Sequence, residues 1–179
     1  MFIHCTDTFA IMSATRCGHT NMYHYFGIEP HSQKFSFSEA VMRPWQEHHN
    51  SIVVLRNPLD RVVSAMKNSE WIEQNKFPSW HYQTFFYQHS SPYMSRTLVG
   101  RNFRIIDFYN LEQYIPRRSD KYQSLRTYSH VDDSTTVEDV YVENEFYTLQ
   151  ALQHEMKIYK ELMVSCERVP VEEWKSLTR

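Results

Sequence analysis

Two short apolar runs, each leading through a polar turn into a helical pattern, most constrain how this chain folds. The first run is FAIM at residues 9–12, and the second is IVVL at residues 52–55. Both are uncharged, and the second is rich in β-branched residues, as expected of strands buried on both faces. Because strands separated by helices pair in parallel, the alternation predicts an α/β fold with a central parallel sheet and helices on both faces.

Two further segments complete the predicted sheet. Residues 34–37 alternate between polar and apolar types, and residues 103–108 form another mainly apolar run. We therefore expect strands near 9–13, 34–37, 52–56 and 103–108, whereas the first seven residues read as a lead-in to the first strand.

The C-terminal third is predicted to be mainly helical. Residues 138–163 carry apolar side chains at intervals of three and four, which indicates one long helix with a buried stripe; these are Phe146, Leu149, Leu152, Met156, Tyr159 and Met163. The polar residues 116–137 read as a surface loop. The tail after Pro170 is expected to fray.

The composition favours a single domain without a general polyanion-binding surface. A length of 179 residues suits one domain spanning 1–179. The formal net charge of −2 gives no reason to expect binding to nucleic acid or to an anionic membrane. A site for an anion must therefore come from local charge.

The cysteines and histidines predict neither a disulfide framework nor a metal site. Three cysteines are odd in number and widely spaced, and there is no C-x-x-C pair. Ten histidines include no H-x-x-x-H or H-E-x-x-H motif, so no metal is expected. No basic leader precedes a long apolar core, which predicts no signal peptide or membrane anchor and a cytoplasmic location.

The turn after the first apolar run has the features of a phosphate site. Arg16-Cys17-Gly18-His19-Thr20 connects the predicted strand to a short helix, and Gly27 stands where that helix would end. Backbone N–H groups at such a turn converge on an anion, and the arginine adds a fixed positive charge. The Walker spacing G-x-x-x-x-G-K-[ST] is absent.

The apolar run at residues 52–55 is also followed by residues that suit an anion site. Arg56 stands at its carboxyl end, where open parallel sheets bind ligands. Asn57-Pro58 reads as a helix N-cap followed by proline at the first helical position. The helix that follows carries Arg61-Val62-Val63-Ser64.

Together these two stretches resemble the sulfotransferases that use 3′-phosphoadenosine 5′-phosphosulfate (PAPS), closest in style to the Golgi and carbohydrate-type members. That family carries a basic residue, a small residue, Gly and two Ser/Thr-like positions after its first strand, and R-[DNEK]-P with R-x-x-S after the second. His19 departs from the usual Ser/Thr. His130-Val131-Asp132-Asp133-Ser134 is similar to an H-[VL]-N-x-S loop near the nucleotide.

The resemblance implies a P-loop-like sulfotransferase fold, PAPS as donor, PAP as product and no metal. It places the 3′-phosphate on Arg56 and Ser64, and the 5′-phosphosulfate on the first turn. The implied nucleotide-binding residues are Arg16, Cys17, Gly18, His19, Thr20, Asn21, Arg56, Ser64, His130 and Ser134.

Transfer to a hydroxyl or amine also needs a general base. His31 is the first candidate, since residues 31–38 resemble the stretch around the catalytic histidine of uronosyl 2-O-sulfotransferases. Glu39 is the second, because the glucosaminyl branch uses a glutamate in this interval. Glu29, His48 and His49 are less favoured alternatives. With Arg16 stabilising the leaving phosphate, His31 and Glu39 form the predicted catalytic set.

Three functions remain open from the sequence. The first is a sulfotransferase acting on a small-molecule or glycan acceptor whose identity the sequence does not fix. The second is a module that binds PAP or PAPS without transfer. The third is a nucleotide-dependent phosphotransferase, which the missing Walker lysine and Ser/Thr disfavour.

Overall fold

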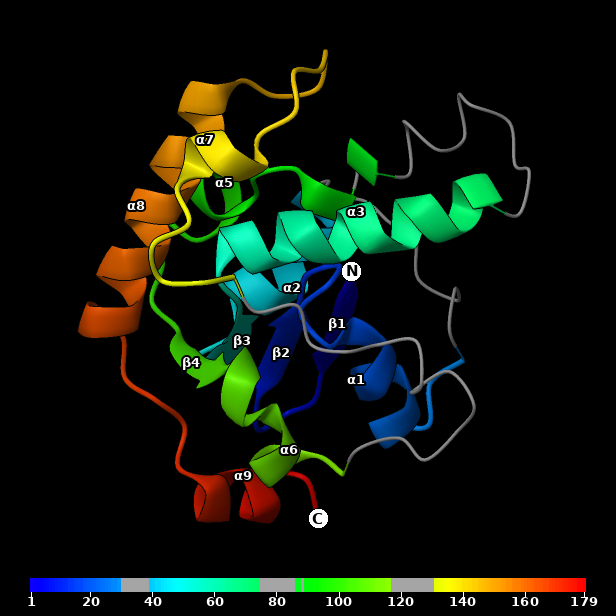
Figure 1. Ribbon diagram of the computed structural model, residues 1–179. Coiled ribbons are helices and arrows are strands. Elements are labelled where there is room, and N and C mark those ends of the chain that lie inside the picture. The colour runs from blue at the N-terminus through cyan, green and yellow to red at the C-terminus, as the bar shows by residue number, and fades with distance from the viewer. Residues whose placement is uncertain (30–38, 75–85, 88, 117–130) are drawn as a thin grey trace. The chain divides into compact units, whose positions relative to one another are not determined.

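The computed structural model describes residues 1–29, 39–74, 86–87, 89–116 and 131–179 (Figure 1). The chain divides into two compact units, which are described in turn. The first comprises 1–56, 100–121 and 162–179, and the second comprises 57–99 and 122–161. Among the described helices, none combines the length and apolarity needed to span a bilayer.

A four-stranded mixed sheet forms the centre of the first unit. Its strands are β1 (Phe2–Cys5), β2 (Ala10–Ser13), β3 (Ser51–Leu55) and β4 (Arg104–Asp107), hydrogen-bonded in the order β1-β2-β3-β4. The pairs β2–β3 and β3–β4 are parallel, as predicted. The predicted strand at 34–37 lies outside the described residues.

The interpretation of residues 1–7 as a lead-in is wrong, because β1 pairs with β2 in antiparallel orientation. The connection between the two strands is a tight turn in which the Thr6 N–H donates to the Phe9 carbonyl at 2.9 Å. The Thr6 hydroxyl oxygen also accepts the N–H groups of Thr8 and Phe9. A four-residue strand containing a histidine and a cysteine shows too little periodicity to be recognised in the sequence.

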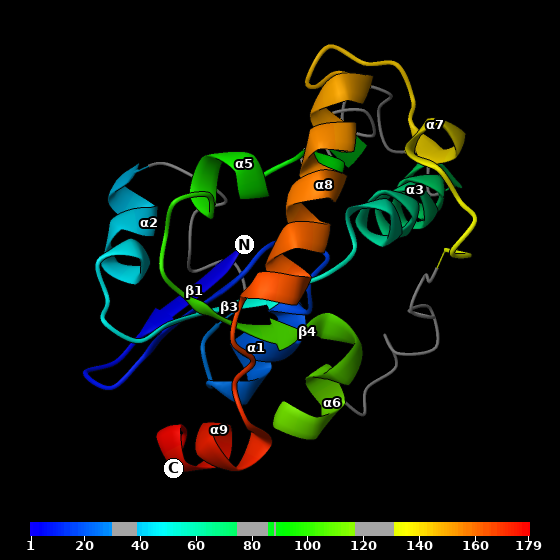
Figure 2. The ribbon, with the colours of Figure 1, turned by 90° about the vertical axis from the view of Figure 1, so that its left-hand side faces the viewer.

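Helices cover both faces of this sheet, as expected from the alternation. Figure 2 shows α2 (Glu39–Gln46) on one side, and α1 (His19–Tyr25), α6 (Leu111–Tyr114) and α9 (Val171–Leu177) on the other. A short 3-10 turn, η1 (Phe108–Asn110), joins β4 to α6. Gly27 adopts a φ of 63° just after α1, so the prediction that it stops the helix is confirmed.

The expectation of a frayed C-terminus is also wrong. Trp174 of α9 is fully buried, and its indole N–H donates to the Tyr114 carbonyl at 2.9 Å. Its ring lies against Phe9 and Phe26. Two N–H···O contacts of 2.8 and 2.7 Å join Arg104 of β4 to the Glu173 carboxylate. The aromatic contacts and this ion pair fix α9 to the sheet.

The second unit is helical. Its elements are α3 (Pro58–Gln74), α5 (Met94–Thr97), α7 (Val137–Val140) and most of α8 (Leu149–Ser165). One core cluster joins them, made of Leu59, Val62, Ala65, Phe86, Val140, Tyr147 and Leu152.

The single helix predicted over 138–163 is interrupted. Residues 141–148 are not helical, because the Asn144 carboxamide oxygen accepts the N–H groups of Phe146 and Tyr147 at 2.9 and 3.0 Å. Such side-chain bonds offer the backbone an alternative to the helix. Phe146, assigned to the buried stripe, is 44% exposed.

A buried carboxylate takes the place of an apolar residue on the inner face of α8. Glu155 is fully buried, and its oxygens accept the N–H groups of Tyr93, Met94 and Ser95 at 2.7–3.3 Å. These N–H groups precede or begin α5, where no intrahelical acceptor exists. Glu155, which is distant in the sequence, therefore supplies the hydrogen-bond acceptors for the N–H groups at the start of α5.

Replacing Glu155 with Ala should lower the free energy of unfolding by about 3 kcal/mol or more, because several buried N–H groups lose their acceptor. The matched control on the same helix is Glu161→Ala, whose carboxylate is exposed, with an expected change of about 0.5 kcal/mol. Urea denaturation of both variants measures the difference. Equal losses would show that Glu155 does not carry the stabilisation assigned to it.

Candidate functional site

The carboxyl ends of three parallel strands meet at one edge of the sheet in the first unit. Ser13 of β2 pairs with Val54 of β3, and Leu55 of β3 pairs with Asp107 of β4. The next residues in the chain therefore emerge together. This is the edge at which open α/β sheets bind ligands.

The turn after β2 is held in a defined conformation by its own bonds. The Cys17 N–H donates to the Ala14 carbonyl at 3.0 Å, and the Ser13 hydroxyl donates to the Cys17 carbonyl at 2.6 Å. Between them Arg16 has a φ of 66°, in the left-handed region that non-glycine residues seldom adopt. Strained backbone of this kind clusters at functional sites.

Arg56, the first residue after β3, reaches this turn. Its Nη1 donates to the Arg16 carbonyl at 2.7 Å, and its guanidinium carbon lies 4.4 Å from the centroid of the Phe108 ring. The side chain is only 3% exposed. The structure thus brings together the two arginines that head the two sequence motifs.

Gly18 has a packing role in addition to its role in the turn. Its φ is 82°, and a Cβ built there would lie 2.5 Å from Leu111 Cδ2 and 3.6 Å from the Phe108 ring. The turn therefore packs directly on the segment that follows β4. Sequence reasoning identified the glycine but gave no sign of this contact.

The helix that follows the turn presents its first N–H groups beside it. Gly18 is the N-cap of α1, and the first helical bond runs from the Met22 N–H to the Gly18 carbonyl at 3.1 Å. The N–H groups of His19, Thr20 and Asn21 precede it and have no acceptor within the helix. These three residues are partly exposed. Cys17 differs, because it is fully buried and its N–H closes the turn.

The start of the second motif has the predicted local structure. The Asn57 side-chain oxygen accepts the Leu59 N–H at 2.9 Å, so Asn57 caps α3 and Pro58 is its first residue. Ser64 lies on this helix and is partly buried. It belongs to the second unit and Arg56 to the first, so their shared contact with a 3′-phosphate stays a prediction.

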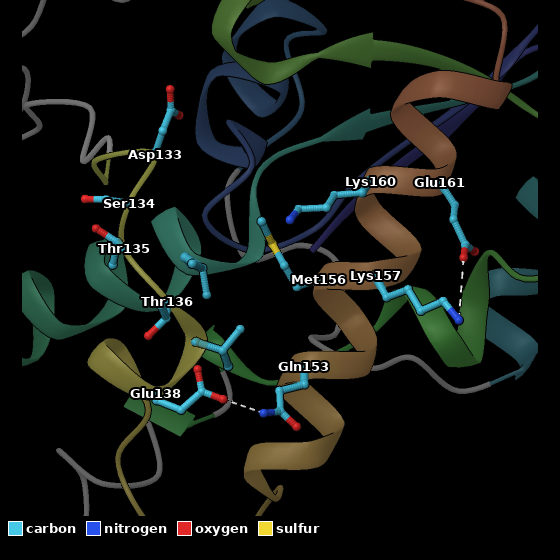
Figure 3. A pocket seen from close by; sticks show the side chains of 12 residues that line it. Asp133, Ser134, Thr135, Thr136, Glu138, Gln153, Met156, Lys157, Lys160 and Glu161 are labelled. Carbon is cyan, nitrogen blue, oxygen red and sulfur yellow. Dashed lines mark hydrogen bonds and ion pairs between the residues drawn. The ribbon is translucent and has the colours of Figure 1, made fainter.

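The H-V-D-D-S stretch is described from Val131 onward, and His130 lies outside the described residues. The Val131 N–H donates to the carboxylate of Asp60, a fully buried residue of α3, at 2.6 Å. The Ser134 hydroxyl donates to Asp132 at 2.7 Å and so stabilises its own turn. Ser134 also lines a pocket of the second unit (Figure 3).

The two candidate bases are not placed by the structure. His31 lies outside the described residues, and only the backbone of Glu39, at the start of α2, is described. Their roles stay predictions. His48 has a structural role, because its Nε2 lies 3.0 Å from the Thr6 carbonyl and its Nδ1 accepts the Asn50 N–H at 3.0 Å.

Asp107 is a carboxylate at this edge that sequence reasoning did not single out. It ends β4, and its Oδ1 accepts the Tyr109 N–H at 3.0 Å. Burial raises the pKa of Asp107 above its ordinary value, although the positive charge of Arg168 opposes this. A carboxyl group with a raised pKa can exchange a proton closer to neutral pH than an ordinary one.

Within the part of the chain that the structure describes, no group of three or more His, Cys, Asp and Glu side chains could hold a metal ion. The chain also matches no family model, no curated protein and no solved structure. The chemistry of the site is therefore argued from the geometry of the turn and its two arginines.

Gly18→Ala should lower the free energy of unfolding by about 2–4 kcal/mol, combining left-handed strain with overpacking against Leu111. Gly27→Ala is the matched control, since its φ is also positive but no atom lies within 4 Å of the added Cβ. It should lose only about 1–2 kcal/mol. The difference, measured by thermal or urea unfolding, isolates the contact with Leu111, and its absence would contradict the tight packing of the turn.

Proposed function

We propose that this chain is a sulfotransferase that moves a sulfuryl group from PAPS to a hydroxyl or amine of a small-molecule or glycan acceptor. One observation carries the proposal: the 2.7 Å hydrogen bond from Arg56 Nη1 to the Arg16 carbonyl. It unites two motifs 40 residues apart at the carboxyl edge of adjacent parallel strands. The sulfotransferase resemblance requires both motifs to serve one nucleotide.

The chemistry follows the logic of phosphoryl transfer, in which positioning and charge stabilisation dominate. The acceptor oxygen or nitrogen attacks the sulfur as the bond from sulfur to the 5′-phosphate oxygen breaks. PAP leaves with that oxygen, and the acceptor proton passes to a base. Arg16 and the first N–H groups of α1 suit the growing negative charge on the leaving phosphate.

Arg56 is proposed to contribute to PAPS binding in two ways. Through its bond to the Arg16 carbonyl it fixes the turn that meets the 5′-phosphosulfate. A guanidinium carries five N–H donors in a planar fork, so it can bond a backbone carbonyl and a phosphate at once. The resemblance places the 3′-phosphate on this same guanidinium, together with Ser64.

Arg56→Ala should weaken PAP binding by about 2–4 kcal/mol, the range for truncating one partner of a buried charge pair. Adenosine 5′-phosphosulfate lacks the 3′-phosphate, so its affinity should fall less, and only through the loss of the bond that fixes the Arg16 turn. Calorimetric titration of both ligands provides the comparison. Equal losses would remove Arg56 from the 3′-phosphate and leave it a purely structural role.

A companion variant, Arg16→Gly, separates the effect of the Arg16 charge on nucleotide affinity from any effect on the free energy of unfolding. Glycine accepts a φ of 66° freely, so the free energy of unfolding should stay within about 1 kcal/mol of the parent. Affinity for both nucleotides should nevertheless fall about tenfold or more, because a charged hydrogen-bond donor is lost. Arg43→Ala, in an exposed ion pair with Glu47, is the control that should leave affinity unchanged.

If His31 is the base, His31→Ala should lower turnover by about 10²- to 10⁴-fold with little change in donor affinity. Glu39→Ala tests the rival assignment in the same sulfuryl-transfer assay. A histidine base should also make the rate rise with pH around its titration, near about 6.5 when unperturbed. If neither substitution changes turnover, both residues lose the role. If the parent binds PAP but transfers nothing, the chain acts as a nucleotide-binding module instead.

A further inference from the structure

A pocket of about 590 Å³ lies within the second unit (Figure 3). The turn at 133–136 and the start of α7 form one wall, and Met156, Lys157 and Lys160 of α8 form the other. Leu59 of α3 also lines the pocket. Pockets of about 300–1,000 Å³ suit small organic ligands.

The lining includes an apolar surface. Leu59, Val137 and Met156 present hydrocarbon or thioether groups, and Val137 and Met156 are only partly buried. Leu59 belongs to the hydrophobic core of the unit, against which Val137 and Met156 also pack. A ligand with an apolar body would remove this remaining surface from water.

The two lysines of the pocket differ in what they contact. The Lys157 ammonium lies 3.9 Å from the Glu161 carboxylate, and Figure 3 shows this pair directed away from the turn. Lys160 extends the other way, towards Met156 and the turn (Figure 3). Among the described residues, the Lys160 ammonium makes no hydrogen bond or ion pair.

Several polar groups of the opposite wall are already engaged with protein partners. The Glu138 carboxylate accepts a hydrogen bond from its own backbone N–H and another from Gln153, and these bonds, the backbone one foremost, lower the pKa of Glu138. The Thr136 hydroxyl donates to Asp139 in a capping box. In Figure 3 the Asp133 carboxylate points outward. Asp133 and Lys160 are thus the charged lining groups without a partner among the described residues, and of these two Lys160 is the one directed towards Met156.

We propose that this pocket binds a small amphipathic anion. The anionic head meets the Lys160 ammonium, and the apolar body lies on Leu59, Val137 and Met156. Lys160, Leu59, Val137 and Met156 belong neither to the predicted catalytic set nor to the predicted nucleotide-binding residues, so the proposal does not rest on sulfuryl transfer. Ser134, which also lines the pocket, is shared with the predicted nucleotide-binding residues.

The experiment titrates the full chain, without nucleotide, with two probes of similar shape: 4-phenylbutyrate and its neutral amide, 4-phenylbutanamide. The titrations are repeated with Lys160→Met and with the control Lys157→Met. Methionine keeps about the length of the side chain and removes the charge together with its N–H donors. Both lysines are exposed on α8, so neither substitution should alter thermal unfolding, which is measured in parallel.

The parent should bind the acid about tenfold more tightly than the amide, as expected for a hydrogen bond to a charged group. Lys160→Met should abolish that preference, and Lys157→Met should retain it. Three results would overturn the proposal: no saturable binding of the acid, equal binding of acid and amide by the parent, or the same loss in both variants.

Discussion

The candidate site depends on the hydrogen bond between the Arg56 guanidinium and the Arg16 carbonyl. Arg16 stands in a left-handed conformation that costs an ordinary residue about 1–2 kcal/mol. Several contacts hold the turn in this strained conformation. They are the hydrogen bonds from Arg56, Ser13 and Cys17 and the packing of Gly18 on Leu111. Groups from β2, from the end of β3 and from the segment after β4 therefore define one small loop. A loop fixed in this way is preorganised for a ligand.

The second unit uses buried charged side chains to hold irregular backbone. Arg61 donates to the carbonyls of His89 and Ser91 at 3.2 and 3.3 Å and lies 4.6 Å from the centroid of the Tyr93 ring. Glu155 accepts the N–H groups at the start of α5, and Asp60 accepts the Val131 N–H. Burying a charge is costly unless it is well bonded. Here each charged group meets backbone dipoles whose own burial would otherwise be unfavourable.

The sequence predicted the elements that have strong apolar periodicity. Strands β2, β3 and β4 come from such runs, and the caps at Asn57 and Gly27 follow from local chemistry. Their common edge places Arg16 beside Arg56, because adjacent parallel strands present their carboxyl ends together. The elements that the sequence did not predict depend on contacts between residues distant in the chain. Strand β1 is defined by pairing with β2, and α9 by the burial of Trp174. Gly18 is fixed by Leu111, and no pattern in the sequence reports that contact.

Functional residues were less predictable than the fold. Arg56 donates to the Arg16 carbonyl, a contact that the sequence did not predict, while Cys17 is buried and contributes to the packing of the turn. Ser134 is engaged with Asp132, and the buried roles of Asp60 and Glu155 were not foreseen. A charged residue in a helical pattern is most often solvated, and only tertiary structure reveals when it faces inward.

The most direct test of the central claim is a crystal structure of the protein with PAP bound. The account predicts the 5′-phosphate within hydrogen-bonding distance of Arg16 and of the first N–H groups of α1, with the 3′-phosphate on Arg56. A nucleotide bound away from the Arg16 turn, with the Arg56 bond to the Arg16 carbonyl intact, would contradict it.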